Sequence, residues 1–76
     1  MDQPITVHVS FLSMHYDKEY EPGVTVRDFT LKLIEDYMLT GGCSVSVNGV
    51  SMTHQLDYEL QDGDNITVHP KIISGG

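Results

Sequence analysis

The feature that most constrains the fold is the pattern of apolar residues: one segment has them at helical spacing, and the segments on either side have them at every second position, as in strands. From Thr25 onward apolar side chains recur every three or four residues, which predicts an amphipathic helix with one apolar stripe. That stripe consists of Val26, Phe29, Leu33 and Tyr37, with Ile34 and Met38 beside it. A chain of 76 residues has room for one domain and one core. The helix is therefore expected to cover one face of a sheet formed by the rest of the chain.

Local signals mark both ends of this helix. Thr25 is a favoured N-cap residue, and Asp28 follows three positions later, where its carboxylate can complete a capping box. Pro22-Gly23 ends the segment before it. Gly41-Gly42 is expected to stop the helix as its C-terminal cap, because glycine readily adopts the left-handed backbone conformation.

Alternation predicts a hairpin in the first third of the chain. Apolar residues at every second position from Ile5 to Phe11 predict a strand with one buried face. The polar segment 15–21 is expected to return as the exposed second arm of the hairpin. Tyr16 and Tyr20 on this arm are weighed as partner contacts.

The second half of the chain predicts three more strands. Residues 43–47 alternate, and Asn48-Gly49 is a strong hairpin signal that leads into a short return strand. Leu56 and Leu60 are expected to anchor a connecting loop or a short helical turn under the core. A tight Asp-Gly-Asp turn at 62–64 then leads into a last strand at 65–69, which Pro70 ends. The resulting order of elements predicts an α+β fold of the β-grasp type, with a mixed four- to five-stranded sheet and one main helix on one face. Residues 1–70 are expected to form the domain and 71–76 a flexible C-terminal tail.

Charge and composition narrow the classes of partner. Eleven acidic and four basic residues give a net charge of -7, which disfavours nucleic acid and anionic membrane and favours a partner with a basic docking surface. The lone Cys43 cannot form an internal disulfide, and no apolar run approaches the ~18 residues of a membrane span. Asp2 stands where a signal peptide is basic. A cytoplasmic location is therefore expected.

Few residues are candidates for chemistry within the domain. The four histidines lack the spacing of a metal site and are interpreted as solvated or hydrogen-bonded side chains: His8, His15, His54 and His69. Cys43 is interpreted as a small core or edge residue, and its role is left open. The sequence contains no nucleophile–base pair, phosphate-binding loop or paired carboxylates. The protein is therefore expected not to be an enzyme with an active site of its own.

Four segments, taken in order, resemble the ubiquitin-like sulfur carriers, the family of ThiS in thiamine synthesis and MoaD in molybdopterin synthesis. They are Glu-Pro-Gly-Val-Thr-Val at 21–26, Val-Ser-Val-Asn-Gly at 45–49, Leu-Gln-Asp-Gly-Asp-Asn-Ile at 60–66, and the terminal run from Pro70 to Gly75-Gly76. Each segment alone is common, but their order, their spacing to the Gly-Gly ending and the domain length are similar to this family.

The resemblance implies that the Gly76 carboxylate is the reactive group. A carboxylate is a poor electrophile and must first be activated. An adenylating enzyme similar to ThiF or MoeB would use ATP and Mg to form an acyl-adenylate at Gly76, and a cysteine desulfurase or rhodanese would supply persulfide sulfur. The resulting thiocarboxylate would pass sulfur to an acceptor synthase. The resemblance further implies that the partner recognises the extended tail: Ile72, Ile73, Ser74 and Gly75. Bound cofactors are not expected in the carrier itself.

Alternatives stay open at this level. Where ubiquitin-type tails carry arginine, this chain has Ile73 followed by Ser74, which argues against eukaryotic ubiquitin-activating enzymes, and few lysines argue against chain building. The same activated Gly76 could instead be joined to lysines of target proteins, as in ubiquitin-like modifiers. A third reading is a β-grasp adaptor with an inert tail. Whether thiamine or molybdopterin is the pathway is not decided by the sequence.

Overall fold

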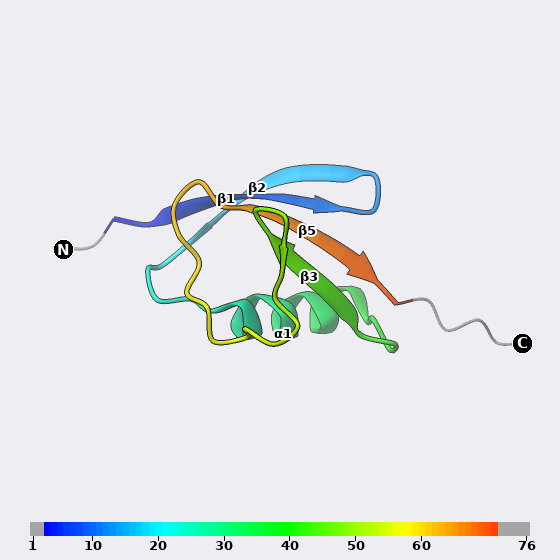
Figure 1. Cartoon of the computed structure of the whole chain (residues 1–76). Helices are drawn as coiled ribbons and strands as arrows, with labels where there is room; N and C mark the ends of the chain where they lie inside the picture. Colours follow the sequence, from blue (N-terminus) through cyan, green and yellow to red (C-terminus); the bar gives the residue numbers. More distant parts are fainter. Residues whose placement is uncertain (1–2, 72–76) are drawn as a thin grey trace, which may run out of the picture.

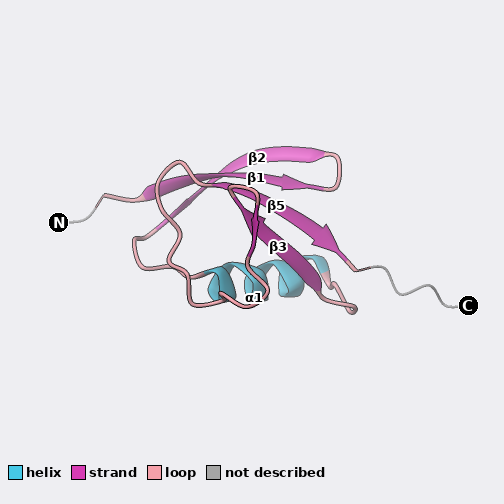
Figure 2. Ribbon diagram, viewed as in Figure 1, coloured by secondary structure: helices cyan, strands magenta, loops and turns pink. Residues whose placement is uncertain are grey.

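The computed structural model describes residues 3–71 and has the predicted order of elements (Figure 1). The elements are β1 (Ile5–Phe11), β2 (Met14–Tyr20), α1 (Val26–Tyr37), β3 (Cys43–Val47), β4 (Val50–Ser51) and β5 (Asn65–Pro70). The strands form one sheet in the order β2-β1-β5-β3-β4. The central β1 and β5 run parallel, and the other neighbours are antiparallel. Helix α1 crosses one face of this mixed sheet, as the β-grasp prediction requires (Figure 2).

The core lies between α1 and the facing side of the sheet. Every second residue of β1 is buried, so the predicted alternation is confirmed. The helix contributes Val26, Phe29 and Leu33, which confirms most of the predicted stripe. The stripe ends earlier than expected, because Tyr37 is 46% exposed and Met38 is 81% exposed. The remaining buried apolar residues come from β3, β5 and the segment between β4 and β5: Val45, Val47, Met52, Leu60, Ile66 and Val68.

The start of α1 is built as the sequence predicts. The Asp28 backbone N–H donates to Thr25 Oγ1 at 3.2 Å, and the Thr25 backbone N–H donates to Asp28 Oδ2 at 3.1 Å. This reciprocal capping box satisfies two backbone donors that the first turn leaves without helical partners.

The end of α1 corrects the prediction. Met38, not the Gly41-Gly42 pair, adopts the left-handed conformation that terminates the helix, with φ 53° and ψ 49°. The Leu39 N–H then bonds the Ile34 carbonyl at 3.1 Å, and Leu39 packs against the core. This bond is the one that closes a Schellman cap, and the burial of Leu39 adds to the stability of the early stop. Gly42, at φ 77°, instead turns the chain into β3.

Two further expectations are corrected by side-chain packing. Tyr16 and Tyr20 are partly buried against the core, so β2 is not an evenly exposed arm. Their position follows from pairing, since Tyr16 lies opposite Val9 and Tyr20 opposite Ile5, whose side chains are buried on the helix side. In the connection between β4 and β5, Leu60 is buried as expected, but Leu56 is 37% exposed.

The two tight turns of the second half are tied together by Asp64. Asn48 and Gly49 have φ values of 52° and 84°, which confirms the predicted hairpin. Gly63, at φ 85°, forms the second turn. Asp64, only 6% exposed, accepts from Asn48 Nδ2 at 2.9 Å, the Tyr58 hydroxyl at 3.1 Å and the Gln61 N–H at 2.8 Å. One carboxylate therefore fixes both turns beside the start of β5.

Candidate functional site

The residues predicted to carry the reaction lie outside the described part of the chain. These are Gly76 and the tail residues Ile72, Ile73, Ser74 and Gly75. The structure does describe the point from which they continue, which is Lys71. The geometry of that point is therefore what the fold contributes to the predicted site.

Lys71 follows a strand that is held on both sides. β5 pairs in parallel with β1 and antiparallel with β3, and its last residue, Pro70, lies opposite Cys43. One residue further, the Lys71 N–H still donates to the Gly42 carbonyl at 3.0 Å. The segment beyond Lys71 therefore continues from a strand that is paired on both of its edges.

Cys43 lies beside this attachment point. Its side chain is partly buried, and desolvation raises the pKa of the thiol, an effect that the positive charge of Lys71 partly opposes. A raised pKa reduces the thiolate fraction at neutral pH, and the thiolate is the nucleophilic form. The position agrees with the interpretation of Cys43 as a small edge residue.

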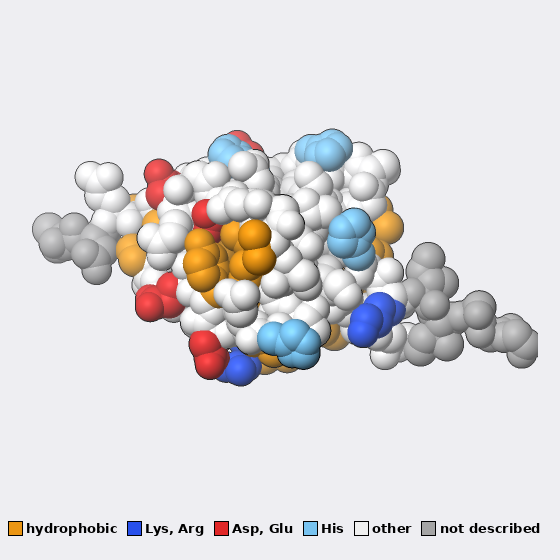
Figure 3. Space-filling model, in the orientation of Figure 1, with side chains coloured by type: hydrophobic (Ala, Val, Ile, Leu, Met, Phe, Trp, Pro, Cys, Tyr) orange, Lys and Arg blue, Asp and Glu red, His pale blue; other side chains and the backbone are white. Residues whose placement is uncertain are grey.

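The sheet face opposite α1 is polar throughout. The side chains that alternate with the buried positions of the three central strands are hydroxyl, imidazole and amide groups: Thr6, His8, Ser10, Ser44, Ser46, Asn65, Thr67 and His69. In the view of Figure 3, which has the orientation of Figure 1, the visible Asp and Glu side chains lie mostly toward the N-terminal side of the molecule. Any docking on this sheet face must therefore use hydrogen bonds and charge in place of an apolar patch.

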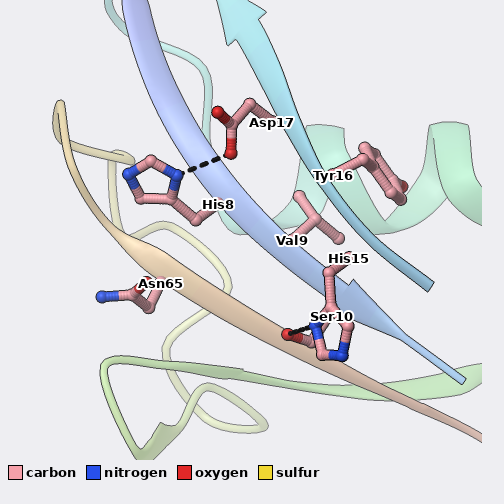
Figure 4. Close-up of a pocket in the computed structure, with 7 residues that line it drawn as sticks. All are labelled: His8, Val9, Ser10, His15, Tyr16, Asp17 and Asn65. Carbon is pink, nitrogen blue, oxygen red and sulfur yellow. Dashed lines mark hydrogen bonds and ion pairs between the residues drawn. The ribbon is translucent and has the colours of Figure 1, made fainter. Parts of the chain in front are cut away.

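A shallow depression of about 500 Å³ lies on this polar face, between β1, β2 and the start of β5 (Figure 4). His8 Nδ1 lies 2.7 Å from Asp17 Oδ1, and Ser10 Oγ lies 3.0 Å from His15 Nδ1. A serine nucleophile needs one histidine that contacts both the serine and an orienting carboxylate. Here the two pairs share no residue, so they are cross-strand hydrogen bonds and do not form a triad.

These two pairs were not predicted from the sequence, although a signal for them exists. With a two-residue turn at Leu12-Ser13, hairpin register places residue 8 opposite 17 and residue 10 opposite 15. The expectation that histidines are hydrogen-bonded is confirmed for His8 and His15. Within residues 3–71, no three His, Cys, Asp or Glu side chains converge as metal ligands. In the same part of the chain no helix is long and apolar enough to cross a membrane.

Comparisons with known proteins identify the fold. No protein family and no curated protein matches the sequence. Among solved structures, ubiquitin of Caldiarchaeum subterraneum superposes with a TM-score of 0.74 at 13% identity, over 96% of this chain and 100% of that one. The ubiquitin-like domain of an Arabidopsis thaliana protein superposes with a TM-score of 0.69 at 22% identity, over 93% of this chain and 81% of that one. A second structure of that Arabidopsis protein gives 0.68 at 18% identity. The chain thus has the ubiquitin-like β-grasp fold.

Proposed function

We propose that this protein is a sulfur carrier whose reactive group is the carboxylate of Gly76. The observation that carries the proposal is the attachment of the tail: a Gly-Gly segment follows, within five residues, the last described backbone hydrogen bond of a doubly paired strand. Two successive glycines give the narrowest strip that a polypeptide can offer, which suits a confined active site of a partner enzyme. The ubiquitin-like fold and the four sequence motifs support the same reading.

The proposed chemistry has three steps, all of them in partner enzymes. An activating enzyme transfers AMP from ATP to the Gly76 carboxylate and releases pyrophosphate, so the carbonyl carbon gains a good leaving group. A protein persulfide then attacks this carbon and displaces AMP, which forms an acyl disulfide. A thiol reduces the S–S bond and releases the Gly76 thiocarboxylate, whose sulfur goes to a thiamine or molybdopterin precursor on an acceptor synthase. The carrier is a cosubstrate in each step, and this thiol chemistry suits the reducing cytoplasm.

A second candidate, protein modification, is favoured by a separate observation. The archaeal protein that superposes with a TM-score of 0.74 is a ubiquitin. In that function the activated Gly76 is transferred to a lysine of a target protein and forms an amide. The two functions share activation and differ in the final acceptor.

Intact mass measurement tests the proposal. The protein is first purified from its own cells to confirm that the mature chain ends at Gly76, and is then incubated with ATP, Mg, an activating enzyme and a persulfide donor. We expect a mass gain that matches the exchange of one oxygen for sulfur. Gly76→Trp is expected to abolish this gain with thermal unfolding unchanged, whereas Cys43→Ser is expected to retain it.

Other outcomes separate the candidates. Immunoblots of cell lysate that show larger conjugates resistant to reductant would move the assignment to protein modification. Absence of any adduct, with the activating enzyme shown to be competent on another carrier, would overturn activation of Gly76 by that class of enzyme. A sulfur adduct that persists in Gly76→Trp would place the reactive group elsewhere in the chain.

A further inference from the structure

A hollow of about 100 Å³ separates β2 from α1, on the opposite side of the sheet from the polar face. Among the named elements, α1 and β2 have no Cα atoms within 8 Å of each other, so side chains alone bridge this gap. Its walls are Tyr16, Lys18 and Tyr20 from β2, and Phe29, Lys32, Leu33, Asp36 and Tyr37 from α1. We call this hollow the β2–α1 groove. A volume of this size admits one apolar side chain from a partner.

Aromatic packing fixes the walls of the β2–α1 groove. The Tyr20 ring meets Phe29 edge-on with centroids 6.1 Å apart, and Tyr37 packs on Phe11 at 4.9 Å. Three of the four tyrosines of the chain line the groove. Tyrosine offers a large contact area at low conformational cost, and it is enriched where proteins bind one another. The groove is therefore preformed and carries the residue type expected of a recognition surface.

The strand that borders the groove has an unused hydrogen-bonding edge. β2 is the last strand of the sheet on its side, and no other strand within residues 3–71 pairs with its outer edge. The even-numbered residues of β1 direct their backbone groups to the β5 side, since the His8 N–H bonds the Asp64 carbonyl at 2.8 Å. By alternation, the residues of β2 opposite them point their N–H and C=O groups outward. These are His15, Asp17 and Glu19.

Charge along this edge alternates between the two faces of the sheet. Lys18 faces the groove, whereas Asp17 and Glu19 project onto the polar face. On the α1 wall of the groove, Lys32 Nζ lies 3.1 Å from Asp36 Oδ1, one helical turn away. Two of the four basic residues of a chain with net charge -7 thus line the groove, against one acidic residue. The groove is locally positive on an acidic protein.

We infer that the β2 edge and the β2–α1 groove bind an extended segment of a partner protein by strand addition. The segment would pair its backbone with His15, Asp17 and Glu19. Its groove-facing residues would place an acidic side chain opposite Lys18 between two apolar ones beside Tyr16 and Tyr20, of which one enters the hollow and the other lies along its rim. Its outward residues would be basic. None of the residues that line this surface belongs to the tail, so it would serve a docking partner whether or not Gly76 is activated.

The same charge pattern disfavours a second copy of this chain as the occupant. Antiparallel pairing of two β2 strands about Asp17, Lys18 or Glu19 places that residue beside its own equivalent in the other copy. Like charges directly opposite on a sheet are destabilising. A segment with the complementary alternation meets opposite charge at all three positions, so a different protein is the better fit.

Two synthetic peptides of equal composition test the inference on the full chain. The first contains Val-Lys-Glu-Lys-Val, which puts glutamate opposite Lys18 and valines toward the groove. The second contains Lys-Val-Glu-Val-Lys, which loses either the apolar contacts or the ion pair in every register. We expect the first to bind about tenfold more tightly, and to perturb backbone NMR signals in β2 and α1.

Matched protein variants complete the test. Lys18→Glu is expected to weaken binding of the first peptide about tenfold, whereas Lys71→Glu, the same charge change away from the groove, is expected to leave it unchanged. Both side chains are exposed, and circular dichroism verifies that each variant is folded. The inference would be overturned if the two peptides bound equally or if neither bound. It would also be overturned if the perturbed NMR signals were confined to β4, or if the protein self-associated through β2 in a concentration-dependent way.

Discussion

Asp64 is the single carboxylate that the fold buries within residues 3–71, and it holds two turns that are distant in sequence. Its oxygens accept from Asn48, Tyr58 and the Gln61 backbone. Removing the carboxylate takes away the shared acceptor of three part-buried hydrogen bonds, and each bond lost to a charged group costs about 1 kcal/mol or more. We predict that Asp64→Ala lowers the free energy of unfolding by about 2–4 kcal/mol in urea denaturation.

Two variants show whether the hydrogen bonds are the cause. Tyr58→Phe removes one of the three donors and keeps the ring, so its expected cost is about 1 kcal/mol. Glu59→Ala removes an exposed carboxylate from the same connection and is expected to change stability by less than about 0.5 kcal/mol. A cost for Asp64→Ala as small as that of Glu59→Ala would show that the two turns hold without the carboxylate.

Tyr20 makes stability depend on pH in the alkaline range. Burial, with smaller contributions from Tyr16 and Asp36, raises the pKa of its phenol from 10.0 to about 12. The folded protein thus retains this proton to higher pH than the unfolded chain does. The associated stability is fully present below about pH 10 and is lost as the pH rises toward about 12.

Tyr20→Phe isolates this effect, because phenylalanine keeps the ring contact with Phe29 and has no ionisable proton. We predict that urea midpoints of the wild-type protein fall more steeply over this pH range than those of Tyr20→Phe. Ultraviolet absorbance of phenolate should show a tyrosine that titrates near pH 12 in the wild-type protein and is missing in the variant. Identical pH profiles for the two proteins would contradict the assignment to Tyr20.

At the scale of an element, the end of α1 offers a test by stabilisation. Met38 holds φ 53° although its side chain is 81% exposed. A left-handed conformation costs a non-glycine residue about 1 kcal/mol, and glycine avoids most of that cost. We predict that Met38→Gly raises the free energy of unfolding by about 0.5–1 kcal/mol, measured by thermal and urea unfolding. Met38→Ala loses the same exposed side chain but keeps a Cβ, so it should bring no comparable gain. Destabilisation by glycine would mean that the methionine side chain stabilises the cap.

This cap also shows what sequence reasoning can and cannot predict. The capping box at Thr25 and the Asn48-Gly49 turn were predictable because both are local: the residues that make each bond are at most three apart. The early stop at Met38 was missed because it depends on Leu39 packing into a core assembled from distant strands. A glycine pair is a reliable helix-stop signal only where tertiary contacts do not end the helix first.

The same distinction applies to sites. Tyr16 and Tyr20 lie in a polar segment without apolar alternation, so their burial follows only from register with β1 and from the approach of α1. The β2–α1 groove could not be predicted because its two walls are set by packing between elements. In contrast, the role proposed for Gly76 rests on covalent chemistry and on the order of the motifs, both of which can be read from a sequence directly. That role stays a prediction, because Gly76 lies outside the described part of the chain.

For the whole molecule, the described structure separates folding from the proposed reaction. Within residues 3–71, every residue of the buried apolar core lies between Ile5 and Val68, and the last described backbone bond is that of the Lys71 N–H to Gly42. We predict that truncation after Lys71 leaves the thermal midpoint within about 2 °C of the full chain, because the shorter chain keeps every described core contact and strand pair. The same truncation should abolish the sulfur mass gain, since Gly76 is absent.

A shorter chain provides the contrast. Truncation after Val68 deletes His69, Pro70 and Lys71, and with them the pairing of β5 to Ser44, Cys43 and Gly42. Loss of these ladder bonds and exposure of Val68 at a new chain end should lower the thermal midpoint by about 5 °C or more. If truncation after Lys71 destabilised the protein as much as truncation after Val68 does, residues 72–76 would contribute to the fold. The loss of the mass gain could then no longer be assigned to the missing carboxylate alone. Equal stability of the full chain and the 1–71 chain instead leaves Gly76 as the cause of any difference in reactivity.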